Sequence, residues 1–161
     1  MKPTRSMSPP GTYFVTTSTA AKRAIFGAEN LAHVFLKTLY HYRREGAYLI
    51  HEFVLMPDHF HLIFTPTAVT LERAMQFIKG GSSRRLKSEG VFYGEVWQRG
   101  FTDHRIRDAG DYASHREYLL NNSVKRYLAA LPEQYRYCSA YPGYKLDPWP
   151  SAAKAVVAKA L

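Results

Sequence analysis

Apolar residues along the chain fall into short dense runs and into longer stretches with helical spacing, which predict strands and helices respectively. Residues 13–19 (YFVTTST) and 47–56 (AYLIHEFVLM) are dense runs rich in β-branched and aromatic side chains. A Met-Pro-Asp turn then leads into residues 59–65, so the second and third strands should form a hairpin. Residues 96–106 (VWQRGFTDHRI) predict a fourth strand region.

The longer stretches repeat apolar residues every three or four positions. Residues 27–46 carry such a stripe and predict the first helix. Residues 70–90 predict the second, with Thr70 as its N-cap, and the Gly-Gly-Ser-Ser run at 80–83 is expected to break or kink it. Residues 108–131 predict a third helix in two pieces.

The resulting order is strand, helix, strand, strand, helix, strand, helix, which is typical of an α+β fold. We expect a ferredoxin-like antiparallel sheet with helices packed on one face, plus a C-terminal helix. Residues 13–149 should form one domain, including a terminal loop packed by its aromatic side chains. Residues 1–12 predict a flexible basic arm, and residues 150–161 a tail or short helix.

Composition narrows the class of protein. The 161 residues are 46% hydrophobic, enough for one globular core and too few for two domains. A single cysteine and no CxxC pair argue against a disulfide framework or a cysteine-based zinc site. No apolar run has the length of a membrane span, and no apolar signal segment follows the N-terminus. These features favour a cytoplasmic protein without membrane contact.

Charge points to a polyanionic partner. Lys and Arg number 22 against 13 Asp and Glu, which gives a net charge of +9. Such a surface attracts nucleic acid, and the 14% of aromatic residues could stack on bases. A basic but otherwise ordinary enzyme would carry the same charge.

Two histidines stand in the otherwise apolar third strand. Residues two apart on a strand share a face, so His59 and His61 should project together while Phe60 faces the core. Two neutral imidazoles on one face can bind a divalent metal if a third ligand is supplied. By spacing alone, a pair of surface histidines at a sheet edge is an equal alternative. His51 is expected to be a packed or hydrogen-bonded histidine.

The helix over residues 108–131 offers a partner for these histidines. Tyr118 and Asn122 are four residues apart and share a helical face with His115. A tyrosine can act as a nucleophile beside a metal that polarises the electrophile, and an amide oxygen one turn away could be the third ligand. Tyrosine is abundant here, with 12 in the chain, and a helical tyrosine usually serves packing.

Three blocks of the sequence together resemble a known family. MPDHFHLIF (56–64), VWQRGFTDHRIRD (96–108) and SHREYLLNNSVKRY (114–127) resemble the single-tyrosine HUH transposases. Within these, the chain is similar to REP-associated tyrosine transposases, relatives of the transposases of IS200-type insertion sequences. The resemblance extends in order and spacing over about residues 13–149, and implies that this region is one HUH transposase-like catalytic domain.

The resemblance implies roles for four residues. His59 and His61 match the metal-binding histidines, Tyr118 matches the catalytic tyrosine, and Asn122 matches the polar residue that completes the metal site. The chain departs from the family pattern where Asp58 replaces a frequent Asn. Departures also occur where Ser123 replaces a usual Pro, and where Leu120 and Asn121 replace a His-aromatic pair.

The resemblance also implies a reaction. In this family the tyrosine attacks a phosphodiester of single-stranded DNA, with magnesium or manganese as the metal, and leaves a covalent 5′-phosphotyrosine and a free 3′-hydroxyl. A second 3′-hydroxyl reverses the step and rejoins the DNA. The implied substrate carries a hairpin or palindromic repeat, and the protein is implied to work as a monomer or homodimer.

Basic residues are expected to hold the DNA backbone. The candidates flank the glycine run and precede the third helix: Lys79, Arg84, Arg85, Lys87, Arg99, Arg105 and Arg107. A solvated helix face explains the first four equally well. Trp97 could stack on a base, although core packing is favoured.

Four other functions are alternatives to a transposase. A non-cleaving, domesticated hairpin- or sequence-specific nucleic-acid-binding protein would keep the fold but lose the chemistry. An RNA recognition motif is disfavoured because RGFTDHRI lacks most of the expected aromatic positions. A zinc hydrolase would need a general base, and no HExxH motif is present. A replication nickase would share the HUH site but usually carries a helicase region.

Overall fold

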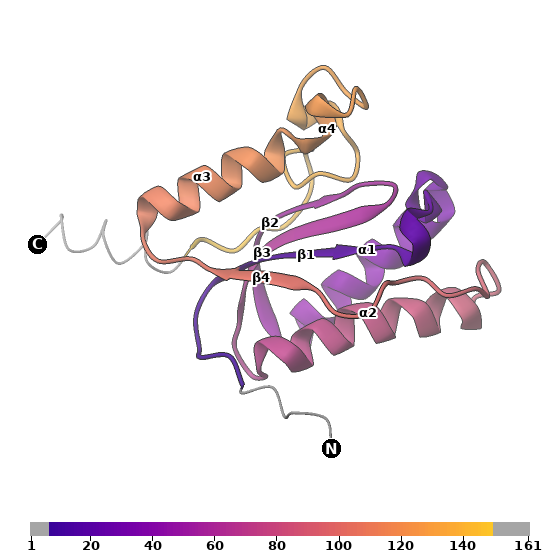
Figure 1. Cartoon of the computed structure of the whole chain (residues 1–161), viewed down its shortest axis with the longest axis horizontal. Coiled ribbons are helices and arrows are strands. Elements are labelled where there is room, and N and C mark those ends of the chain that lie inside the picture. The colour runs from indigo at the N-terminus through magenta and orange to yellow at the C-terminus, as the bar shows by residue number, and fades with distance from the viewer. Residues whose placement is uncertain (1–6, 150–161) are drawn as a thin grey trace, which may run out of the picture.

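The computed structural model describes residues 7–149 (Figure 1). Four antiparallel strands form one sheet in the order β2-β3-β1-β4. The strand bounds are β1 Tyr13–Ser18, β2 Tyr48–Leu55, β3 His59–Pro66 and β4 Thr102–Arg105. The predicted hairpin of the second and third strands is confirmed.

Helices lie on both sides of this sheet. α1 (Glu29–Arg44) and α2 (Leu71–Ser88) cover one face, and α3 (Ala109–Leu120) lies over the other, followed by the short α4 (Asn122–Lys125) (Figure 1). The expected α+β architecture is therefore confirmed, with a helix pair on one face and a separate C-terminal helix carrying Tyr118.

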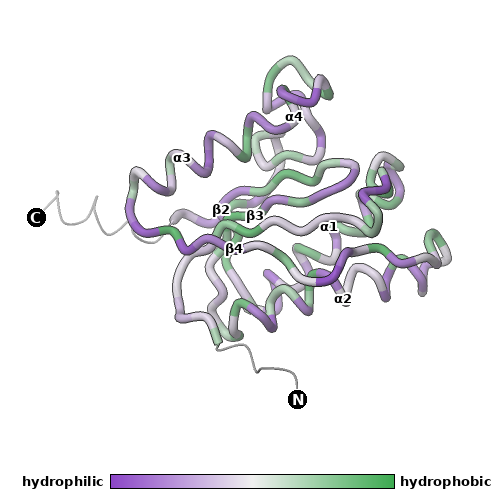
Figure 2. The backbone as a smooth tube through the Cα atoms, viewed as in Figure 1, coloured by the Kyte–Doolittle hydropathy of each residue, from purple (hydrophilic) through white to green (hydrophobic). Residues whose placement is uncertain are grey.

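Alternation along β3 decides which side chains reach which helix layer. Phe60, Leu62 and Phe64 enter the large apolar cluster beneath α1 and α2. His61 and Ile63 face the opposite way, where Ile63 joins a smaller cluster with Leu119 and Leu120 of α3. Figure 2 shows hydrophilic residues along much of α3, in contrast to the apolar centre of the sheet. The histidines therefore lie between the sheet and α3.

The expected break at residues 80–83 is wrong, because α2 runs without interruption through the glycines. A Cβ atom at Gly81 would lie 2.8 Å from the hydroxyl oxygen of Tyr42 and 3.3 Å from the Thr38 methyl group. The glycine therefore serves close approach of α1 and α2. The predicted N-cap is confirmed, since the Thr70 hydroxyl accepts a hydrogen bond from the Arg73 amide.

Two other boundaries differ from the prediction. The fourth strand is confined to Thr102–Arg105, because Gly100 has a φ of +75° and turns the chain just before it. The third helical stretch ends at Lys125 rather than 131, and Tyr127 takes a left-handed φ of +60° two residues later. An apolar pattern cannot show where such backbone turns fall.

The segment of residues 135–149 protects the edge of β2. The Ser139 amide donates to the Phe53 carbonyl at 2.8 Å, and the Asp147 amide donates to the Ile50 carbonyl at 2.7 Å. Tyr144 packs edge-on against Phe53, as expected for an aromatic-packed loop. These bonds occupy main-chain groups that a bare edge strand would expose.

Both ends of the chain extend past the described part. The first residues described, 7–12, are tied to α2, because Ser8 donates to Glu72 through its hydroxyl and amide. The tail or short helix predicted at residues 150–161 lies outside the described residues, as does the start of the predicted basic arm. Within residues 7–149, no helix is both long enough and apolar enough to cross a membrane.

Candidate active site

Three sequence blocks converge at the start of β3. His59 and His61 project from this strand toward α3, with ring centroids 4.8 Å apart. Asn122, at the first position of α4, is buried beside them. Its side-chain oxygen lies 3.2 Å from Nε2 of His59. The structure thus brings together the two histidines and the amide that the sequence singled out.

The hydrogen bonds of His59 show which of its ring nitrogens can bind a metal. Its Nδ1 lies 2.7 Å from a carboxylate oxygen of Asp58. An ionised carboxylate only accepts, so Nδ1 donates to Asp58, and Nε2 is the nitrogen that faces the Asn122 oxygen. When Nε2 carries no proton, its lone pair and the Asn122 oxygen can both bind a metal. Two such atoms about 3 Å apart have the spacing of ligands that share a metal ion at about 2.0–2.2 Å.

Asp58 fixes the orientation of the His59 ring and is itself held by Arg126. Its two carboxylate oxygens accept from one guanidinium nitrogen of Arg126, at 2.9 and 3.0 Å. Burial raises the pKa of Asp58, but the hydrogen bonds from His59 and Arg126 outweigh it and keep the pKa below its ordinary value. A carboxylate that orients a metal-binding histidine increases the basicity of the other ring nitrogen.

His61 is held as a neutral ligand. The side chain is 5% exposed, and its Nδ1 lies 2.7 Å from the Thr16 hydroxyl on the neighbouring β1. Burial, with smaller contributions from the charges of His59 and Lys22, lowers the pKa of His61 to about 3. With Nδ1 bonded to Thr16, Nε2 is the nitrogen available to a metal. Two imidazoles and one amide oxygen form a donor set that fits a divalent cation.

Tyr118 lies beside the histidines and open to solvent. Its side chain is 50% exposed, and its ring centroid is 5.7 Å from that of His61. The ring also contacts Phe14 edge-on, and Nζ of Lys125 lies 5.5 Å from its centroid. Tyr118, His61 and Phe14 line a cleft of about 490 Å³. A nucleophile needs this access, whereas Tyr48 is fully buried and serves the core.

Only some of the predicted DNA-binding residues lie near this cleft. Lys79 donates to the carbonyls of Gln98 and Gly100 at 2.8 and 2.6 Å, so its ammonium fixes the loop before β4. Burial lowers the pKa of Lys79. Three residues lie on α2, across the sheet from the histidines: Arg84, Arg85 and Lys87. The structure does not bring them to the candidate site.

The other three basic candidates lie near the β4 edge. Arg99 is exposed in the preceding loop. Arg105 donates to the Pro10 carbonyl at 2.8 Å, and Arg107 is exposed just before α3. Trp97 is buried, and its indole N–H donates to Ser82 at 3.0 Å, so the expectation of core packing is confirmed.

Several contributors to the site were not predicted. The sequence predicts Asp58 only as a turn residue and as a departure from a family pattern, although its place next to His59 is a usable signal. Arg126 lies four residues after Asn122, so helical spacing predicts that the two side chains share a face. Thr16 and Phe14 come from β1, and nothing in the sequence reveals the strand pairing that brings them here.

Comparisons with known proteins identify the family of the chain. The sequence model of the family described as "Transposase IS200 like" matches residues 11–122. A REP-associated tyrosine transposase of Escherichia coli K12 is 26% identical over 121 residues, covering 71% of this chain and 67% of that protein. A Haemophilus influenzae protein with the same, provisional, name is 27% identical over 107 residues, covering 60% of this chain and 61% of its own length.

A solved structure shares the fold. The structure of a REP-associated tyrosine transposase bound to a REP hairpin superposes with a TM-score of 0.65 at 22% identity. The superposition covers 94% of this chain and 96% of that chain. At this identity the likeness is one of architecture. The matched region spans less than two thirds of the Haemophilus influenzae relative.

Proposed function

Because the chain belongs to the IS200-like transposase family, we propose that it cleaves and rejoins single-stranded DNA through a covalent 5′-phosphotyrosine on Tyr118. One observation carries the proposal above all. Nε2 of His59 and the side-chain oxygen of Asn122 are 3.2 Å apart, with His61 and the exposed Tyr118 beside them. A nucleophile next to a cation-binding donor set suits attack on a phosphodiester.

The metal would be held by His59, His61 and Asn122, and magnesium or manganese fits the proposed reaction. When bound, the ion supplies polarisation of a phosphoryl oxygen and helps to orient the strand. Asp58 contributes by keeping the His59 proton on Nδ1, and Thr16 contributes by orienting the His61 ring.

The chemistry of the chain's own residues balances in each direction. The Tyr118 oxygen forms a bond to phosphorus while the bond from phosphorus to the 3′-oxygen breaks. The phenol loses one proton and the departing 3′-oxygen gains one, so no net proton is needed. The ammonium of Lys125, beside the Tyr118 ring, offers positive charge to the incoming phosphate. A different 3′-hydroxyl can reverse the step and join two strands.

The substrate we propose is single-stranded DNA with a hairpin or palindromic repeat. The net charge of +9 favours a polyanion, and Arg99, Arg105 and Arg107 lie toward the open edge of the sheet near β4. The structural relative was solved with a REP hairpin, which supports the same class of DNA. One chain supplies all four proposed site residues, and both a monomer and a homodimer are compatible with that. A cytoplasmic location stays a prediction.

The test uses labelled strands from the repeats that flank the gene, both strands and hairpins included. The full-length protein is incubated with them and magnesium or manganese, and the products are separated on a denaturing gel. We expect a metal-dependent protein–DNA adduct that disappears in Tyr118→Phe, while DNA binding is retained. Tyr127→Phe is the matched control, because Tyr127 is 96% exposed and does not line the cleft.

Two outcomes would count against the proposal. An adduct that persists in Tyr118→Phe would exclude this tyrosine as the nucleophile. Tight hairpin binding by the wild-type protein without any adduct, under both metals, would favour the non-cleaving binding protein.

A further inference from the structure

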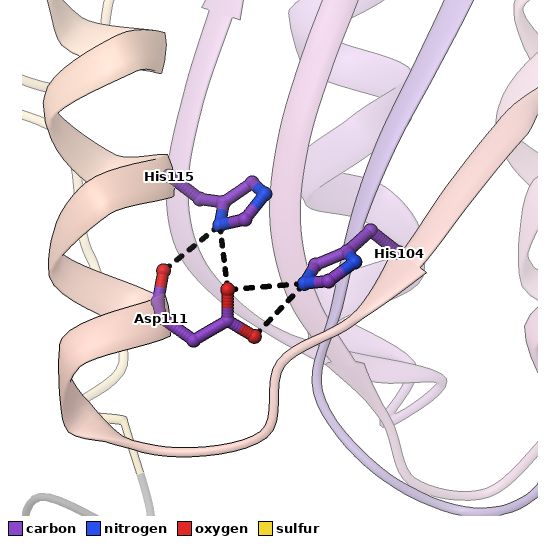
Figure 3. Close-up of side chains that lie close together, drawn as sticks. All are labelled: His104, Asp111 and His115. Atoms are coloured by element: carbon purple, nitrogen blue, oxygen red, sulfur yellow. Dashed lines mark hydrogen bonds and ion pairs between the residues drawn. The ribbon is translucent and has the colours of Figure 1, made fainter.

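A second group of metal-binding side chains lies where β4 meets α3. His104 comes from β4, and Asp111 and His115 come from α3 (Figure 3). One nitrogen or oxygen atom from each lies within 4.8 Å of the other two. All three side chains are partly buried. His115 of this cluster lies one helical turn before Tyr118, and the cluster shares no residue with the proposed catalytic metal site.

The carboxylate of Asp111 is the centre of the cluster. Its Oδ1 lies 3.0 Å from Nε2 of His104 and 3.0 Å from Nδ1 of His115. The two imidazole rings are stacked, with centroids 4.4 Å apart and planes at 14°. Both rings thus direct a nitrogen at Oδ1, and Nε2 of His104 also lies 2.8 Å from Oδ2 (Figure 3). In the metal-free protein each of these nitrogens donates a proton to the Asp111 carboxylate.

The spacing of the residues favours chelation. Asp111 and His115 are four apart on a helix and so share a face, and the neighbouring strand adds His104. We propose that these three residues form a second metal site that takes zinc or a similar transition-metal ion. Two imidazole nitrogens and one carboxylate oxygen match the ligands of zinc. A fourth position would be filled by water.

The carboxylate is already oriented for this purpose. The other oxygen of Asp111, Oδ2, accepts from the Arg107 amide at 2.9 Å. Burial opposes ionisation, but the hydrogen bonds from Arg107 and His104 outweigh it and keep the pKa of Asp111 below its ordinary value. Supporting bonds of this kind fix ligand orientation at metal sites. Oδ1 can therefore bind the ion while Oδ2 stays with the backbone.

Metal binding would require two local changes. Nδ1 of His115 donates to the Asp111 carbonyl at 2.8 Å, and this bond would be given up with the proton. Within α3 that carbonyl faces the amide one turn later, so it keeps a main-chain partner. The guanidinium of Arg107 lies 3.7 Å from Oδ2, but its side chain is 77% exposed and can turn into solvent. The ion would tie the start of the Tyr118 helix to the sheet.

The chain contains a matched control. Glu29 and His33 form an acid–histidine pair with the same spacing on α1, with Oε1 and Nε2 3.5 Å apart. No third metal-binding residue among the described residues groups with this pair. If the helical pair alone were sufficient for zinc, both positions would bind it. If the strand histidine is required, only the cluster with His104 will.

The experiment measures zinc bound per chain by the full-length protein after removal of any affinity tag. The protein is stripped with a chelator, dialysed against zinc alone and analysed for its metal content. We expect His104→Ala and Asp111→Asn each to hold one zinc fewer than the wild type. His33→Ala should hold the wild-type amount. His61→Ala separates this site from the proposed catalytic one, because it should leave the zinc at His104 in place.

Asp111→Asn keeps a hydrogen-bond acceptor at the helix start, so it covers the case in which His104→Ala does not fold. Equal zinc content in wild type, His104→Ala and Asp111→Asn would overturn the proposal. So would a zinc that is lost in His61→Ala but kept in Asp111→Asn, since the ion would then belong to the other site. The inference does not rest on the proposed function, and adduct formation can fail while this result stands.

Discussion

On the α1–α2 side of the sheet, β3 contributes Phe60, Leu62 and Phe64 to a large apolar cluster. On the α3 side the same strand contributes His61 and Ile63, and the apolar cluster there is small. The first side gains its stability from area removed from water, which is not directional. The second side must hold polar groups in fixed positions.

Polar contacts attach α3 to the sheet at several points. Near its centre, Arg116 donates to Glu52 of β2 at 2.8 Å, and the buried Glu52 also accepts from Ser139. At its start, Asp111 accepts from His104 of β4. Hydrogen bonds of this kind add little net stability but strongly constrain geometry. We infer that one face of the sheet provides most of the stability of the fold, and that the other fixes the geometry of the candidate site.

Phe60→Ala should give the largest loss of stability, because it removes a side chain from the large apolar cluster. Phe60 is fully buried, with its ring centroid 4.7 Å from that of Phe35 in α1. Its removal should lower the free energy of unfolding by about 3–5 kcal/mol, as lost transfer energy plus a cavity. Urea denaturation measures this change. The folded fraction should still form the DNA adduct at close to the wild-type rate.

The size-matched pair Leu62→Ala and Ile63→Ala removes isomeric, fully buried side chains from the two faces of the same strand, and each change should cost about 2–5 kcal/mol. We expect the larger cost at Leu62, which lies in the large cluster, and a larger cost at Ile63 would contradict the proposed difference between the faces.

Gly81→Ala should have the next largest effect. The added methyl group would lie 2.8 Å from the Tyr42 hydroxyl oxygen and 2.9 Å from its ring, so the Tyr42 side chain, which stacks on Phe77, or the helices themselves would have to shift. Overpacking of this kind costs about 1–3 kcal/mol. Gly80→Ala is the matched control, because a Cβ there meets nothing within 4 Å and alanine favours helix. Thermal unfolding should show destabilisation at 81 and stabilisation at 80. The reverse order would show that the helices are not in contact through Gly81.

This glycine also shows why sequence patterns predicted some features and missed others. The Gly-Gly-Ser-Ser run has a weak intrinsic helix preference, so a break was expected, and tertiary packing against Tyr42 overrode that preference. The first three strands and the first helix were predicted well, because dense or periodic apolar patterns reflect burial directly. The end of the third helix was missed, since it depends on the left-handed backbone of Tyr127.

The site followed the same rule. His59, His61, Tyr118 and Asn122 were singled out from spacing within one strand and one helix, and the structure places them together. Their roles stay predictions. The cluster around Asp111 was missed, because His104 joins it through the position of α3 over the β4 edge. Spacing along the chain carries no information on that contact.

Asp58→Asn should reduce metal affinity rather than stability. Asparagine keeps an acceptor for the His59 N–H but loses the charge and the pair with Arg126. Loss of such a supporting group costs about tenfold in metal affinity, or about 1.4 kcal/mol. The check is the manganese concentration that gives half-maximal adduct formation. Arg126→Gln retains the carboxylate and should give a smaller increase. An unchanged manganese requirement in Asp58→Asn would separate Asp58 from the metal site.

The smallest effect is expected at the β2 edge, away from both faces. Arg43 donates to both carboxylate oxygens of Asp147 at 2.8 Å, and the Ile50 amide donates to one of them. The Arg43 hydrogen bond is the main cause that keeps the pKa of Asp147 below its ordinary value, against the opposing effect of burial. The pair should contribute about 1 kcal/mol to stability at neutral pH.

The sign of the pH dependence follows from that lowered pKa. As pH falls below about 5, the unfolded chain takes up the proton first, since a free aspartate titrates near about 3.9. The stabilisation from Asp147 is therefore complete above that range and is lost as pH falls through the folded-state pKa. Urea denaturation between neutral and acid pH should show a shallower loss of stability in Asp147→Asn than in wild type. Parallel pH profiles would mean that the carboxylate has the same pKa folded and unfolded. At neutral pH the variant should form the DNA adduct at the wild-type rate, because the edge segment holds neither the metal ligands nor Tyr118.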